Sequence, residues 1–196
     1  MLVLQSPRAV FTALRDDSNA AAHARQEPLV ALVYLAGIAG VLATTTSGRL
    51  LDVPEFDGLL IAVWAFSAGG IYGVATYWLG GAAVYLGARL AGGRGSYRRA
   101  RHLLGFAAAP LGLVLLTWPV RIALYGGDLF RTGGADAGAA NRFFDALELA
   151  AIGWMLALIV LGMRVVHGWS WPRSLAGSAL PALAPALLLA GAYGIF

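Results

Sequence analysis

Four arginines fall within eight residues of the stretch Gly92–Pro110, and no acidic residue lies among them. They are Arg94, Arg98, Arg99 and Arg101. Guanidinium groups bind phosphate and carboxylate oxygens through paired hydrogen bonds, so the chemistry open to this stretch is the binding of anionic headgroups. Long apolar runs flank the stretch, and an arginine-rich loop between two membrane spans marks the cytoplasmic side. Topology alone is the simpler interpretation of these arginines, and lipid binding is the second.

Polar and aromatic side chains accompany the arginines in the two loops expected on the cytoplasmic side. The candidate lipid- or partner-binding set is Arg94, Ser96, Tyr97, Arg98, Arg99, Arg101, His167 and Trp169. His167 belongs to the second of these loops, where we expect it to cap or orient the chain after the fourth apolar helix. The set predicts a surface for anionic lipid or for a protein partner.

Catalysis and cofactor binding find no support in the residue pattern. The glycine-rich GGRGS sequence lacks the Lys-Ser/Thr ending of a phosphate-binding loop. The chain has no cysteine, which excludes disulfides and cysteine-ligated metals. His23, His102 and His167 are too far apart in sequence to form a local ligand pair. We therefore predict a non-enzymatic protein with no metal and no cofactor.

One ionisable residue, Glu148, lies close to the interior of an apolar run, where charged groups are costly and often functional. Its expected partner is Arg121, at the outer end of the preceding span. The pair would line a polar cavity, or Glu148 would simply mark the membrane boundary, and the second interpretation is the simpler. Pro110 interrupts the same preceding span and frees a backbone carbonyl, which is typical of a hinge or a binding niche.

The composition is that of a membrane protein. The chain has 196 residues, of which 59% are hydrophobic and 12% charged, against about 25% charged in soluble domains. Its net charge of +4 does not predict nucleic-acid binding, because the arginines lie in short loops beside apolar runs.

Apolar runs divide the chain into five expected spans. They cover about residues 29–48, 59–80 with an extension to 91, 102–124, 143–166 and 175–195. The uncharged run 58–88 would measure roughly 46 Å as a helix, too long for one upright crossing and too short for two. Since an acidic loop precedes this run and the arginine loop follows it, we count one crossing, with a bend at Gly80–Gly81. Kinks are expected at Pro110 and Pro119.

The distribution of charge orients these spans. With the N-terminus inside, ten of the 14 arginines and three of the 10 acidic residues fall on the cytoplasmic side. This bias follows the positive-inside rule. The predicted fold class is therefore an all-α integral membrane protein with five transmembrane helices, a cytoplasmic N-terminus and an outer C-terminus.

A polar tail, residues 1–27, precedes the membrane domain 28–196 and contains a short amphipathic helix at 6–15. Ser6 is the expected N-cap and Pro7 the first helical residue. Val10, Phe11 and other apolar residues share one face of this helix. We expect an interfacial helix lying among the lipid headgroups. A helix packed on its own protein is the alternative.

Small residues four apart recur in the spans and predict close helix packing within one bundle. These pairs are Ala36/Gly40, Gly69/Gly73 and Gly153/Ala157.

The stretch GGRGSYRRARHLLGFAAAP, followed later by HGWS, resembles the Yip domain family of five-span membrane proteins. The matching positions are Gly92, Gly93, Gly95, Ser96 and Tyr97; Gly105, Phe106, Ala107 and Pro110; Gly162, Arg164, His167, Gly168 and Ser170; and Pro7 and Phe11 in the first helix. The resemblance implies a five-helix bundle without known catalytic residues, and a prokaryotic member of the family. Eukaryotic members bind small GTPases through a longer cytosolic N-terminal region than residues 1–27 provide, so GTPase binding is not expected here.

Two functions are consistent with these patterns. The first is a scaffold in the cytoplasmic membrane of a prokaryote that binds anionic lipids, a second copy of itself or another membrane protein. The alternative is a small transporter or channel with a polar path near Glu148 and the Pro110 kink. Transporters commonly carry inverted repeats, which an odd number of spans does not readily accommodate, so the scaffold is favoured.

Overall fold

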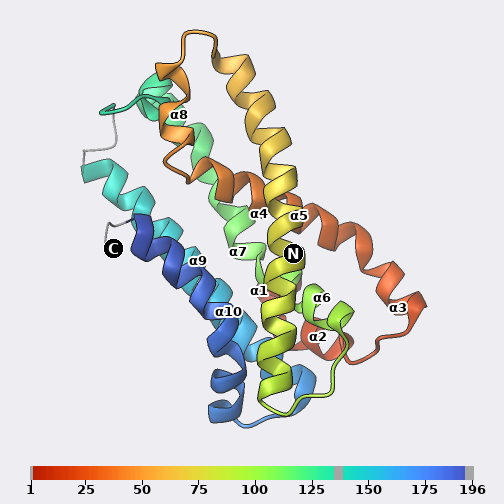
Figure 1. Ribbon diagram of the computed structural model, residues 1–196. Helices are drawn as coiled ribbons and strands as arrows, with labels where there is room; N and C mark the ends of the chain where they lie inside the picture. The colour runs from red at the N-terminus through yellow and green to blue at the C-terminus, as the bar shows by residue number, and fades with distance from the viewer. Residues whose placement is uncertain (1, 135–138, 193–196) are drawn as a thin grey trace.

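The computed structural model describes residues 2–134 and 139–192, and the described secondary structure is helical throughout (Figure 1). The elements in chain order are α1 (Leu2–Gln5), α2 (Pro7–Ala13), α3 (Asn19–Ala24), α4 (Gln26–Leu42), η1 (Ser47–Asp52), α5 (Gly58–Leu90), α6 (Tyr97–Ala107), α7 (Ala109–Val114), η2 (Leu115–Thr117), α8 (Trp118–Tyr125), η3 (Gly126–Phe130), α9 (Ala139–His167) and α10 (Trp171–Ala192).

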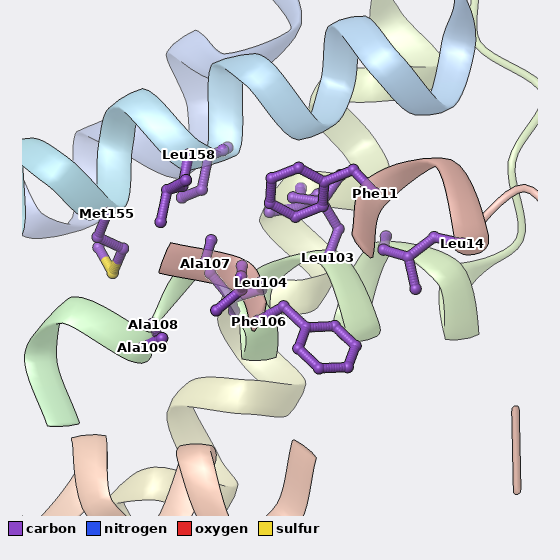
Figure 2. Close-up of a cluster of buried hydrophobic side chains, with 14 of the residues drawn as sticks. Phe11, Leu14, Leu103, Leu104, Phe106, Ala107, Ala108, Ala109, Met155 and Leu158 are labelled. Atoms are coloured by element: carbon purple, nitrogen blue, oxygen red, sulfur yellow. The ribbon is translucent and has the colours of Figure 1, made fainter. Parts of the chain in front are cut away.

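The N-terminal helix α2 packs inside the protein. Phe11 is 0% exposed and Leu14, which follows the helix, is 1% exposed. Figure 2 shows the Phe11 ring reaching from α2 toward Leu103 of α6, and both belong to the main apolar core. Protein therefore covers the apolar face of helix 6–15, which is the alternative to an interfacial helix, and its depth relative to the lipid headgroups stays a prediction. Ser6 stands at the N-cap but its side chain makes no capping bond, whereas Pro7 occupies the first turn as expected.

The first apolar helix, α4, ends at Leu42 rather than near residue 48. The Thr44 hydroxyl donates to the carbonyl of Val41 and accepts from the Ser47 amide. Such side-chain bonds compete with the helical ladder and end it. The chain then makes the 3-10 turn η1.

Glycines bring α4 and α5 into backbone contact. A Cβ added at Gly37 would lie 2.1 Å from the Gly69 carbonyl oxygen and 2.7 Å from the Gly73 Cα. Gly40 likewise lies against the ring of Tyr72. The predicted close packing at Gly69/Gly73 is thus present within the bundle. Gly153 has nothing within 4 Å of such a Cβ, so the third predicted small pair makes no close approach there.

Helix α5 is continuous through the predicted bend. It runs 33 residues without interruption at Gly80 and Gly81. These glycines instead admit α6: a Cβ at Gly80 would lie 2.7 Å from Leu104, and one at Gly81 would lie 2.3 Å from Arg101. Close approach of a neighbouring helix, and not a change of direction, is what requires glycine here.

The third apolar stretch is broken as its prolines predict. The α6 helix ends at Ala107, and Pro110 lies in the first turn of α7. The 3-10 turn η2 then separates α7 from α8, whose first turn contains Pro119. Proline is accepted in a first turn because its missing N–H has no intrahelical partner there.

The long helices run between two ends of the molecule (Figure 1). One end gathers α2, the 91–96 loop, the start of α6, the end of α9 and the start of α10. We call this the basic end, because it carries Arg15, Arg98, Arg99 and Arg173. The opposite end holds η1, α8 and η3, where the Thr132 amide donates to the Asp52 carboxylate.

Three described segments are long and apolar enough to cross a membrane, namely Gly58–Leu90, Tyr97–Phe130 and Asn141–His167. The 17-residue α4 is a shorter apolar helix. The number of five crossings and the sidedness of the termini remain predictions, and the last residues, 193–196, lie outside the described part of the chain.

Candidate functional site

A hydrogen-bonded polar cluster lies where the N-terminal tail meets the start of α6. We call it the arginine junction, formed by Asp17, Asn19, Ser96, Arg98 and Arg99. The Arg98 Nε donates to the Asp17 carboxylate over 3.0 Å, and the Ser96 hydroxyl donates to the other carboxylate oxygen. An Arg99 nitrogen lies 3.9 Å from that second oxygen. Two predicted site arginines are therefore already paired with one acidic residue of the same chain.

The remaining bonds of these arginines also go to the tail. Arg98 Nη1 donates to the Asn19 side chain over 2.7 Å, and Arg98 Nη2 donates to the Asp17 carbonyl. Arg99 Nη2 donates to the Arg15 carbonyl over 3.0 Å. Ser96 has a second role, because its hydroxyl accepts the Arg99 amide and caps α6.

The arginine junction sets the ionisation of Asp17. Burial raises the pKa of this carboxyl, but hydrogen bonds from Ser96 and Arg98, together with the charges of Arg98 and Arg99, lower the pKa by more than burial raises it. The net result is an Asp17 pKa below its ordinary value, which keeps the side chain anionic.

Arg101 points away from the arginine junction into an aromatic cage. Its guanidinium carbon lies 3.7 Å from the ring centroid of Trp78, 4.9 Å from that of Tyr97 and 5.4 Å from that of Tyr77. The Tyr97 hydroxyl donates to the Trp78 carbonyl over 2.6 Å. Stacked guanidinium groups keep their charge while covering an apolar surface. Arg101 and Tyr97 thus join α6 to α5.

The turn between α9 and α10 carries the other predicted residues. The rings of His167 and Trp169 stack with centroids 4.4 Å apart, and Arg173 lies 4.7 Å over the Trp169 ring. Arg173 also donates to the Ala91 carbonyl over 2.8 Å. A Cβ at Gly93 would lie 3.0 Å from Trp169, so a glycine is needed where the two loops meet. His167 therefore orders the turn, as expected for a structural residue.

Arg94 stands apart from these contacts. Its side chain is exposed, as are those of Arg8 and Arg89. These three arginines, and not Arg98, Arg99 or Arg101, present their charge freely at the basic end.

At the opposite end, Arg121 and Glu148 form the expected ion pair. Arg121 Nη1 donates to Glu148 over 2.6 Å, and Arg121 Nη2 donates to Asn141 over 3.2 Å. The Arg121 side chain is only 10% exposed and packs over the Trp118 ring at 4.7 Å. The pair ties α8 to α9. Pro110 lies elsewhere and is packed, with less than 2% of its surface exposed.

Sequence reasoning missed Asp17, Asn19, Asn141 and the Trp78 face of the cage. Asp17 was detectable as one of three acidic residues among ten arginines on the predicted cytoplasmic side. Its partners are about 80 residues away, however, and no local pattern gives that pairing.

The arrangement can bind anions and join segments of the chain. Within residues 2–134 and 139–192, no group of three His, Asp or Glu side chains is placed to hold a metal ion.

These features define a helical integral membrane protein whose polar groups gather at its two ends. The chain belongs to the Yip1 domain family, whose model matches residues 1–193. No curated protein and no solved structure gives a match.

Proposed function

We propose that this protein is a non-enzymatic scaffold that crosses the cytoplasmic membrane of a prokaryote five times and binds anionic lipid headgroups at its basic end. The observation that carries the proposal is the set of exposed arginines Arg8, Arg89 and Arg94 at that end. The Yip1 domain family is not known for enzymatic activity. A protein partner or a second copy of the chain is a further ligand for the same surface.

Charge and aromatic residues support the orientation. Trp78 and Trp171 are about half exposed and lie at the basic end, where aromatic side chains favour the headgroup layer. Arginines beside such a belt attract anionic lipids by about 1 kcal/mol each. The exposed acidic residues Asp52 and Asp57 lie at the opposite end.

Helix lengths support five crossings. The 17 residues of α4 measure roughly 26 Å and would cross a thin or locally thinned hydrocarbon layer. The 22 residues of α10 measure roughly 33 Å, which is enough to cross. With the three longer segments, the chain would pass five times between its basic end and its opposite end.

Because the chain has no cysteine, sidedness is testable with single cysteines. Arg94→Cys and Glu55→Cys both replace exposed side chains, at the basic and the opposite end. A membrane-impermeant maleimide should label Glu55→Cys in cells with a permeabilised outer barrier and intact inner membrane, and Arg94→Cys only after lysis. Labelling of both variants, or of Arg94→Cys alone, would contradict the proposed orientation.

Lipid binding is testable by native mass spectrometry of the purified protein. Replacing Arg89 and Arg94 together by Gln should weaken retention of phosphatidylglycerol about thirtyfold, because each arginine contributes about 1 kcal/mol of attraction. The matched control replaces Arg49 and Arg142, which are exposed at the opposite end, and should retain phosphatidylglycerol like the native chain. Equal retention by both double variants would refute lipid binding by the basic end.

A transporter or channel is the alternative. The buried Arg121–Glu148 pair is the observation that favours it, because paired charges near a membrane interior often mark a solute path. Pro110, the other residue of the expected solute path, is fully buried by closely packed neighbours. Close packing at Pro110 leaves no open path there, which favours the scaffold.

A further inference from the structure

The arginine junction holds a carboxylate in the manner in which proteins hold a phosphate group. Two guanidinium groups and one hydroxyl converge on Asp17, with Arg98 at 3.0 Å and Arg99 at 3.9 Å. Arginine forks and hydroxyls are the groups that recognise phosphate oxygens, and a phosphate accepts more of these bonds than a carboxylate does. Asp17 therefore occupies a site that suits another anion.

The junction is occupied entirely from the tail. Besides the Asp17 carboxylate, its arginines bind the Asp17 and Arg15 carbonyls and the Asn19 side chain. One short segment, residues 15–19, thus supplies the hydrogen-bond and ion-pair partners of Arg98 and Arg99, whereas the buried Arg99 Nε has no hydrogen-bond partner. By contrast, neighbouring Asp16 is exposed, and its carboxylate accepts the Ser18 amide two residues on.

In the proposed orientation, the junction lies at the depth of the lipid headgroups. The Tyr97 hydroxyl, between Ser96 and Arg98 in sequence, donates to the Trp78 carbonyl, and Trp78 is 49% exposed. Exposed tryptophans of a membrane protein favour the headgroup layer. Arg98 and Arg99 retain 34% and 22% of their side-chain exposure, so a headgroup at this depth can reach them.

We infer that Asp17 masks a phosphate site: a phosphate-bearing ligand competes with Asp17 for Arg98, Arg99 and Ser96 and displaces residues 15–19 from α6. The exchange keeps each guanidinium paired with an anion, and the released Asp17 carboxylate moves into water, so no unpaired charge is left buried. Helix α2 stays in place, because Phe11 and Leu14 remain buried in the core. This inference rests on the proposed lipid binding and adds to it that the segment 15–19 regulates access to Arg98 and Arg99.

The test compares Asp17→Asn with Asp16→Asn by native mass spectrometry of the full chain. Both variants lose one negative charge, but only Asp17→Asn frees Arg98 and Arg99. Asp17→Asn should bind phosphatidylglycerol about three- to tenfold more tightly than the native chain, and Asp16→Asn within about twofold of it, as expected for removing one partly exposed competitor. Adding Arg98→Gln and Arg99→Gln to Asp17→Asn should abolish the gain. Equal binding by the two aspartate variants would overturn the inference.

Two ligands separate the sources of phosphate. Glycerol 3-phosphate at millimolar concentration should bind Asp17→Asn much less than phosphatidylglycerol does if the ligand is a lipid. A gain for both ligands would assign the site to phosphate groups in general, and a gain for neither would overturn the inference. Loss of lipid on replacing Arg89 and Arg94, with no gain in Asp17→Asn, would leave the proposed function standing and the masking refuted.

A measurement on the native chain needs no variant to fold. Hydrogen exchange in nanodiscs should be faster by about threefold or more at residues 15–19 in phosphatidylglycerol than in phosphatidylcholine, since local opening exposes their amides. Exchange within α2 should be the same in both lipids. Identical exchange of residues 15–19 in the two lipids would also overturn the inference.

Discussion

Truncation of Phe11 tests whether the tail belongs to the protein core or to the lipid surface. The ring is 0% exposed and lies beside Leu103 in the main core. Replacing a fully buried Phe by Ala costs about 3–5 kcal/mol, which includes the cavity left behind. Phe11→Ala should therefore lower the free energy of unfolding by about 3–5 kcal/mol. Phe11→Leu keeps most of the volume and should cost about 1.5 kcal/mol or less.

The assay is unfolding of the purified protein in mixed micelles by added dodecyl sulfate, followed by circular dichroism. Thr12→Ala is the matched control, because Thr12 is exposed on the same helix and its loss should change the free energy by about 0.5 kcal/mol at most. A ring that lay in lipid would leave Phe11→Ala close to this control. That result would refute the burial of α2 and restore the interfacial helix.

Three further outcomes are expected. Gly37→Ala should lower the free energy of unfolding by about 1–3 kcal/mol, because its Cβ would meet backbone atoms of α5. Gly153→Ala has open space around it and should unfold at the temperature of the native chain or above. Equal unfolding midpoints for the two variants would contradict the close crossing of α4 and α5. Arg121→Gln and Glu148→Gln should each lower the free energy of unfolding by about 2–5 kcal/mol, because each leaves the remaining charge without its partner. The double variant should lose less than the sum of the two, and strictly additive losses would exclude a coupled pair. Because the pKa of Asp17 is lowered in the folded state, its ionised carboxylate stabilises the fold at pH values above the ordinary aspartate pKa of about 3.9, and this stabilisation is lost as the pH falls through the lowered pKa. Asp17→Asn should therefore lose less free energy of unfolding than the native chain over that pH range. Identical acid unfolding profiles would argue against the ion pair.

Local features of the sequence predicted much of the fold. The breaks at Pro110 and Pro119 occur where predicted, because proline acts on its own helical turn. Glycine was less informative: Gly80 and Gly81 suggested a bend, whereas they admit the side chains of α6. A glycine pattern alone does not distinguish a flexible point from a crowded one.

The position of the tail was harder to predict for a physical reason. The apolar face containing Phe11 indicates that something covers it, and lipid and protein satisfy that pattern equally well. The Asp17 contacts likewise join residues about 80 positions apart, beyond any local pattern. In contrast, Glu148 and Arg121 are placed on adjoining apolar segments near the same end, so topology alone suggested their pairing.

The burial of Phe11 of α2 against α6 and α9 has a consequence for biosynthesis. The tail is synthesised before α9, against which it packs, and α9 emerges from the ribosome more than one hundred residues later. During that interval the apolar face of α2 lacks its partners and is free for the membrane surface or a chaperone. Docking of the tail onto α9 is therefore a late step of folding, because it requires that α9, the fourth apolar helix, has already been inserted into the membrane.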